Sequence, residues 1–114
     1  PFAGYGTLVA PDGSAVTLEQ NGVFISPIET WTSPATGIEY PSGWTLTVPS
    51  QALNLELTPV LLDSEFAGRS YPPAAYWEGE VRVAGTRQGR SVGGRGFVEL
   101  VGYDPRQMEP TSSP

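Results

Sequence analysis

Residues 76–103, YWEGEVRVAGTRQGRSVGGRGFVELVGY, contain two strand patterns separated by a turn signal. Apolar and polar side chains alternate from Tyr76 to Thr86, and the pattern resumes from Ser91 to Tyr103. The Gln88-Gly89 pair between them is typical of a hairpin turn. Because the alternation has a period of two, this stretch predicts a long antiparallel hairpin and not a helix.

The same alternation extends upstream of the hairpin. Residues 44–48 (WTLTV) and 53–58 (LNLELT) each predict a half-buried strand that ends at a proline. Shorter strands are expected nearer the N-terminus, at residues 5–10, 15–20 and 28–32. Turn signals separate them at Pro11-Asp12-Gly13-Ser14 and Asn21-Gly22, and residues 63–75 are expected to form a loop.

These patterns predict an all-β domain of about eight antiparallel strands. Closure into a barrel is the expected architecture because it leaves no exposed strand edge, and a two-sheet sandwich is the alternative. We expect a bulge or a sharply coiled corner where Gly93, Gly94 and Gly96 come together. Residues 1–104 are predicted to form a single domain, and residues 105–114 a flexible tail.

Missing residue types exclude several kinds of chemistry. The 114 residues include no His, no Cys and no Lys, which removes a Ser-His-Asp triad, a cysteine nucleophile, a lysine Schiff base and a His or Cys zinc site. A net charge of −6 argues against nucleic acid as a partner. No apolar run approaches the length of a membrane span, and no motif predicts a metal or another cofactor.

Two motifs resemble the AttH and carotenoid 1,2-hydratase (hydroxyneurosporene synthase) family. The hairpin at residues 76–103 is similar to the closing hairpin of that family. Residues 31–41 (WTSPATGIEYP), followed by Trp44, resemble the family's Trp-Ser-x-x-Thr-Gly-x-x-Tyr-Pro stretch, and residues 53–65 are also similar. The resemblance covers about residues 5–103.

The resemblance implies a lipocalin-like β-barrel that forms the C-terminal half of a two-domain protein. It therefore implies a missing N-terminal lipocalin-like domain as a partner, and the isolated half is expected to expose an apolar patch or to form a homo-oligomer. Family members include carotenoid hydratases, an isoflavonoid hydratase and polyketide cyclases, so the fold transfers better than the chemistry.

Seven residues are candidates for the site. The resemblance implies that Glu78 and Tyr76 are catalytic, as a Tyr-x-acid element that protonates an alkene. A solvated strand face, with Glu78 and Glu80 paired to arginines, is the alternative for these positions. The expected ligand-binding residues are Trp31, Tyr40, Trp44, Trp77 and Glu65. The tryptophans serve either to line a cavity or to pack the core.

Three functions remain open. The first is a lipocalin-like domain that binds a hydrophobic or amphipathic small molecule, such as an isoprenoid, a polyketide or a lipid. The second is an acid-catalysed hydratase or cyclase, and the third is a carbohydrate-binding β-sandwich. The exposure of the three tryptophans separates these hypotheses, because sugar binding needs flat indole rings on the surface and lipophilic binding needs them in a cavity.

Overall fold

The computed structural model describes residues 2–67 and 74–105. Within these residues the chain forms seven strands and one short 3₁₀ turn, η1 (Pro49–Gln51). The strands are β1 (Phe2–Val9), β2 (Ala15–Thr32), β3 (Glu39–Val48), β4 (Leu53–Pro59), β5 (Glu65–Ala67), β6 (Ala75–Arg87) and β7 (Arg90–Leu100). No helix in the described ranges is long and apolar enough to cross a membrane.

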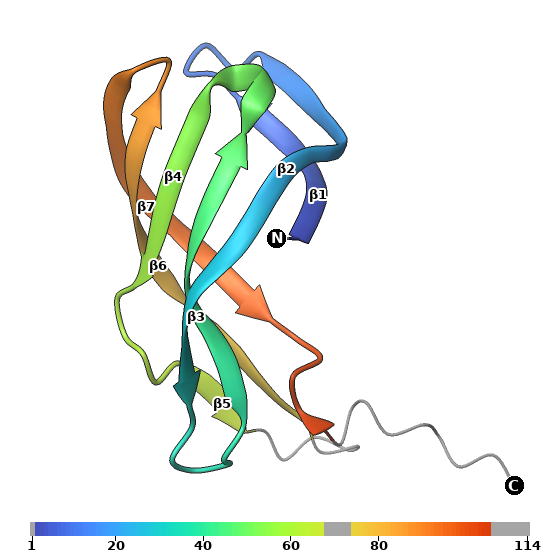
Figure 1. The fold of residues 1–114 in the computed structure, drawn as a ribbon, viewed down its shortest axis with the longest axis vertical. Helices are drawn as coiled ribbons and strands as arrows, with labels where there is room; N and C mark the ends of the chain where they lie inside the picture. The colour runs from blue at the N-terminus through green and yellow to red at the C-terminus, as the bar shows by residue number, and fades with distance from the viewer. Residues whose placement is uncertain (1, 68–73, 106–114) are drawn as a thin grey trace, which may run out of the picture.

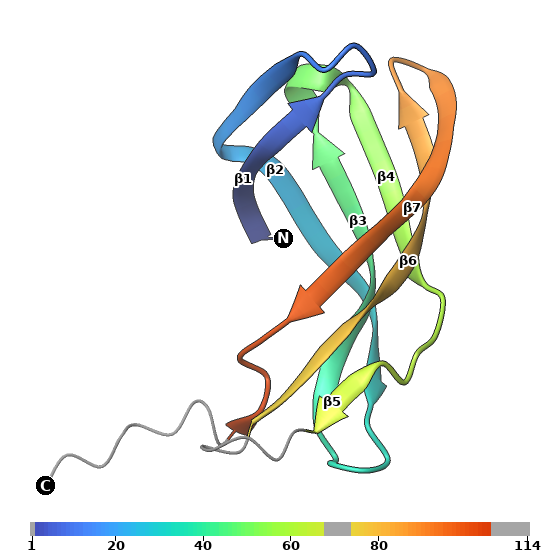
Figure 2. The same ribbon diagram turned by 180° about the vertical axis from the view of Figure 1, so that it is seen from behind.

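The strands form one antiparallel sheet that curls into a half-barrel (Figure 1). The order is β1-β2-β3-β4-β6; β5 pairs with the first residues of β6, and β7 pairs with β6 along its other edge. Across the described residues, β1 pairs only with β2 and β7 only with β6, so these two strands are the edges of the sheet (Figure 2). The predicted all-β, antiparallel, lipocalin-like fold is confirmed, with a half-barrel of seven strands in the described ranges.

The predicted hairpin is present as β6 and β7. Its ladder runs from Trp77 opposite Leu100 to Arg87 opposite Arg90 without a shift in register. Of the two geometries expected at the glycines of β7, a bulge or a sharply coiled corner, the bulge is absent from the ladder. Close packing explains the glycine at position 96, because a Cβ atom on Gly96 would lie 3.1 Å from a methyl group of Val81.

The predicted break at Asn21-Gly22 is wrong, because residues 15–32 form the single strand β2. Asn21 has a φ of 67°, which asparagine tolerates better than most residues. The ladder with β1 shifts here, from Gly4 opposite Val23 to Gly6 opposite Leu18. What the sequence signals as a turn is thus an irregularity that bends one long strand.

The loop expected at residues 63–75 contains the short strand β5, so that prediction is wrong at residues 65–67. Three residues are too few to show an alternation of polar and apolar side chains. The rest of that segment, residues 68–73, and the predicted tail beyond residue 105 lie outside the described residues.

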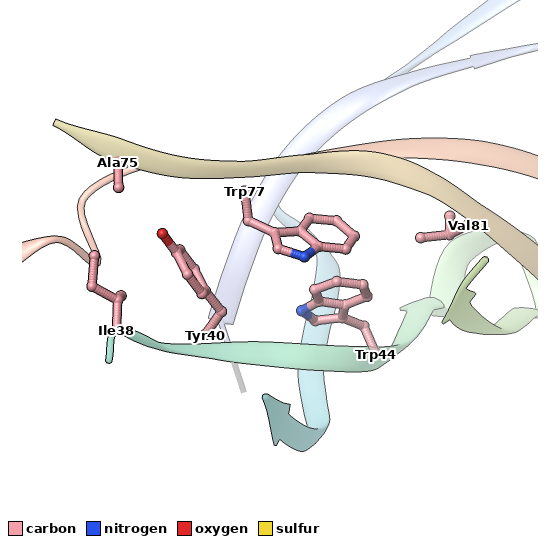
Figure 3. Packing of buried hydrophobic residues seen from close by; sticks show 6 residues of the cluster. All are labelled: Ile38, Tyr40, Trp44, Ala75, Trp77 and Val81. Carbon is pink, nitrogen blue, oxygen red and sulfur yellow. The ribbon is translucent and has the colours of Figure 1, made fainter. Parts of the chain in front are cut away.

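The main core lies where the first halves of β3 and β6 face each other. Figure 3 shows Tyr40 and Trp44 pointing from β3 toward β6, with Tyr40 directed toward Ala75 and Trp44 beside Trp77. A second cluster, around Leu18, Val23 and Val48, fills the other end of the curled sheet. The core therefore closes one end of the half-barrel with aromatic rings, and the candidate site is built around these rings.

Candidate functional site

Two of the predicted ligand-binding residues, Trp44 and Trp77, are buried against each other. Their ring centroids lie 6.0 Å apart with an interplanar angle of 61°, an edge-to-face arrangement. Trp77 is only 2% exposed, and its indole Nε1 donates a hydrogen bond of 2.7 Å to the carbonyl oxygen of Leu62. Both rings and the one polar atom of Trp77 are thus occupied within the core.

Tyr40 and Trp31 lie beside this pair. They are opposite each other on β3 and β2, with stacked rings whose centroids are 6.1 Å apart. Tyr103, just after β7, contacts Tyr40 from another element at a centroid distance of 6.0 Å. Tyr40 is therefore packed between two aromatic side chains, one from the neighbouring strand β2 and one from the segment after β7.

The fifth predicted residue, Glu65 of β5, binds three hydroxyl groups. Ser33 Oγ donates to Glu65 Oε1 at 2.5 Å, while Thr36 Oγ1 and Tyr40 Oη donate to Oε2 at 2.7 Å. We call these four residues the hydroxyl network. It ties the loop between β2 and β3 to β5, so one carboxylate holds together segments that lie about 30 residues apart.

The hydroxyl network fixes the charge of its members. Burial works to raise the pKa of Glu65, but the hydrogen bonds from Ser33, Tyr40 and Thr36 outweigh it and hold that pKa below its usual range. Burial and the Glu65 carboxylate both raise the pKa of Tyr40. At neutral pH Glu65 is thus an ionised acceptor and Tyr40 a neutral donor.

An open groove of about 310 Å³ borders this cluster, and we call it the aromatic groove. Its lining consists mostly of aromatic rings and prolines: Phe2, Pro27, Thr30, Glu39, Tyr40, Pro41 and Tyr103. Phe2 is 66% exposed and Tyr103 is 36% exposed, whereas Tyr40 is almost fully covered. The exposed rings of Phe2 and Tyr103 are thus available to a ligand, with Tyr40 beneath them.

A second hollow, of about 650 Å³, adjoins the aromatic groove and shares Glu39 and Tyr103 with it. We call it the loop hollow because half of its lining comes from the loop before β3. Its lining residues are Ala35, Thr36, Gly37, Ile38, Glu39, Tyr103, Asp104 and Pro105. Ser33 Oγ shapes this loop by accepting the backbone N–H groups of Ala35 and Thr36. Asp104, which is buried, accepts the N–H of Ala75 at 2.8 Å.

The predicted catalytic residues lie elsewhere. Tyr76 and Glu78 are on the outer face of β6, opposite in direction to Trp77. Tyr76 stacks on Phe66 at 5.2 Å, and Glu78 lies directly across from Glu99. Partial burial and the neighbouring Glu99 carboxyl raise the pKa of Glu78. The pair thus has a perturbed acid, but neither residue belongs to the lining of the aromatic groove, and its catalytic role stays a prediction.

Several residues of the site were not predicted. Ser33 and Thr36 lie in the Trp31–Pro41 motif, and this position in the motif could have identified them as site residues. Glu39 stands in the same motif, and Tyr103 ends the motif at residues 76–103. Phe2 carried no such signal, because only the curl of the sheet brings the start of β1 close to the residues after β7.

The curled antiparallel sheet and its aromatic cluster define a lipocalin-like β-domain. A model of the AttH-like family matches residues 2–103, and the chain belongs to that family. A search of curated proteins returns no match. Among solved structures, an AttH protein from Nitrosomonas europaea is similar, with 33% identity and a TM-score of 0.72 over 87% of this chain.

Kievitone hydratase from Nectria haematococca is similar in fold, with 23% identity and a TM-score of 0.69 over 85% of this chain. The matched region spans only 29% of each of these two longer chains. The comparisons therefore establish the family and the fold of this chain.

Proposed function

We propose that this chain forms one wall of a binding site for an apolar or amphipathic small molecule. The observation that carries the proposal is the aromatic groove, where Phe2, Tyr40 and Tyr103 gather beside two prolines. Exposed aromatic surface is stabilised when an apolar body displaces water from it. A volume of about 310 Å³ is at the lower end of the range of about 300–1,000 Å³ that is typical of ligand pockets.

The inner face of the sheet supports the same proposal. Leu57, Val83, Val98 and Leu100 point toward the core but are only partly buried. Since the solved relatives are much longer than this chain, we propose that a further lipocalin-like domain of the same protein covers this face and completes the pocket. A second copy of the chain is the other candidate for this role.

The two alternatives have less support. The likeness to kievitone hydratase is a likeness of fold, and the candidate acid Glu78 lies on the outer face, away from the aromatic groove. A carbohydrate-binding surface needs flat exposed indole rings, whereas Trp44 and Trp77 are buried.

A titration of the 114-residue chain with retinol, an apolar polyene alcohol, tests the proposal. We expect retinol to quench tryptophan fluorescence, because Trp31 stacks on Tyr40 at the groove. Phe2→Ala should weaken binding by about tenfold, since a buried phenylalanine side chain is worth about 1.5–3 kcal/mol of apolar transfer.

Phe97→Ala is the matched control for Phe2→Ala. Phe97 is 67% exposed, nearly the same as Phe2, but it lies on the outer face of β7 and outside the groove. This variant should bind retinol like the parent chain. Equal weakening in both variants would mean that retinol adsorbs to exposed apolar surface in general, and the proposal would fail.

A further inference from the structure

Glu39 occupies a particular place in the aromatic groove. It is the first residue of β3, it is exposed, and it lines both the aromatic groove and the loop hollow. The other groove residues offer rings, prolines and one threonine, so among the described residues Glu39 supplies the only carboxylate of that lining. A molecule lying on the rings would reach this carboxylate where the two hollows meet.

The surrounding charge is negative as well. Residues 1–68 contain seven acidic residues and no basic one, and this part of the sequence supplies β1, β2 and β3. The loop hollow adds the buried Asp104. Neither lining, as given by the described residues, contains an arginine. On β6 and β7, Arg87 and Arg90 lie at the opposite end of the hairpin ladder from Trp77, and Arg82 and Arg95 lie midway along it.

This arrangement discriminates between head groups. A carboxylate on the ligand would meet Glu39 as a like charge, and the described residues of the two linings supply no cation to offset it. A hydroxyl or ammonium group would instead donate a hydrogen bond to Glu39. An ammonium group would also be attracted by the faces of the neighbouring rings.

We infer that the aromatic groove selects amphipathic ligands whose head group donates a hydrogen bond to Glu39, and that it rejects those with a carboxylate head. This inference rests on the proposed function and adds the class of head group. The apolar body lies against Phe2 and Tyr103, and the head lies at the junction with the loop hollow. Glu39 is then the residue that determines specificity.

Three retinoids with the same polyene body test the inference: retinol, retinylamine and retinoic acid. The parent chain should bind the alcohol and the amine about fivefold more tightly than the acid, the effect of two unit charges about 4 Å apart in water. Glu39→Gln keeps the shape of the side chain but removes its charge. In this variant the preference should fall to less than about twofold.

Glu29→Gln is the matched control. Glu29 is also an exposed acid near the groove, but it follows Ile28 on β2 and is not part of the groove lining, whereas its neighbour Thr30 is. The control should keep the full preference of the parent chain, because a preference lost in both variants would assign the effect to net charge and overturn the role of Glu39.

The outcomes separate the two proposals. If the parent chain binds all three retinoids equally well, the inference about the head group is overturned while the groove remains a binding site. Binding of retinol no better than that of retinoic acid also overturns it, even if the amine binds well, because the donor then has no effect. If no retinoid binds, the proposed function itself fails and the inference fails with it.

Discussion

Trp77→Ala is expected to lower the free energy of unfolding by about 4 kcal/mol, within the range of about 3–5 kcal/mol for removing a buried aromatic side chain. The indole of Trp77 is 2% exposed and packs edge-to-face on Trp44. Its loss also leaves the carbonyl oxygen of Leu62 without its indole donor. The measurement is urea unfolding of the 114-residue chain, followed by circular dichroism.

Two further variants make this prediction decisive. Phe97→Ala removes an exposed ring from the outer face and should change stability by less than about 0.5 kcal/mol. Trp77→Phe keeps an aromatic ring in the core but removes the Nε1 donor, so it should unfold between the parent and Trp77→Ala even if the alanine variant does not fold. A parent-like stability of Trp77→Ala would contradict the assignment of Trp77 to the core.

The fold was predictable because alternation is a local signal. In residues 76–103 and 44–58 the alternation indicates which face of the sheet each side chain lies on. It therefore predicts strands at β3, β4, β6 and β7. Local sequence patterns gave the wrong prediction where the backbone conformation depends on pairing with a strand that is distant in the sequence. Asn21-Gly22 has the residue types of a turn, yet β1 pairs with β2 on both sides of it, at residues 15–18 and 23–25, and β2 stays one strand.

The site was predictable in part for the same reason. Aromatic residues in strands usually face the core, so Trp44, Trp77 and Tyr40 were natural candidates from their residue type and motif. The partners of Glu65 and the lining of the groove depend instead on tertiary structure. Phe2 and Tyr103 are about 100 residues apart in sequence, and no local pattern links them.

Glu65→Gln is expected to cost about 3 kcal/mol at neutral pH. The carboxylate accepts three hydroxyl hydrogen bonds, and bonds to a charged acceptor are each worth about 1.5–3 kcal/mol. Glutamine has nearly the same shape, but it carries no charge and directs an amide donor at hydroxyl groups that already donate. Urea unfolding at pH 7, compared with that of the parent chain, measures the loss.

The pH dependence of this effect has a definite sign. Since the pKa of Glu65 is lowered in the folded state, its contribution to stability is present above the ordinary glutamate value of 4.5 and is lost as the pH falls through the folded pKa. The difference between the parent chain and Glu65→Gln should therefore shrink in acid. A difference that stays constant with pH would indicate that shape, and not charge, is what the hydroxyl network requires.

Glu78→Gln is the same substitution at a carboxyl group whose pKa is raised, whereas the pKa of Glu65 is lowered. Partial burial and Glu99 raise the pKa of Glu78, so the folded state favours its protonated form, and the resulting stability is present at low pH and lost as the pH rises through the folded pKa. Removing this charge should leave the chain at least as stable as the parent at pH 7. If Glu78→Gln instead destabilised the chain as Glu65→Gln does, Glu78 would be a buried hydrogen-bond acceptor. The distinction between Glu65 as a structural carboxylate and Glu78 and Glu99 as a mutually repelling pair would then be wrong.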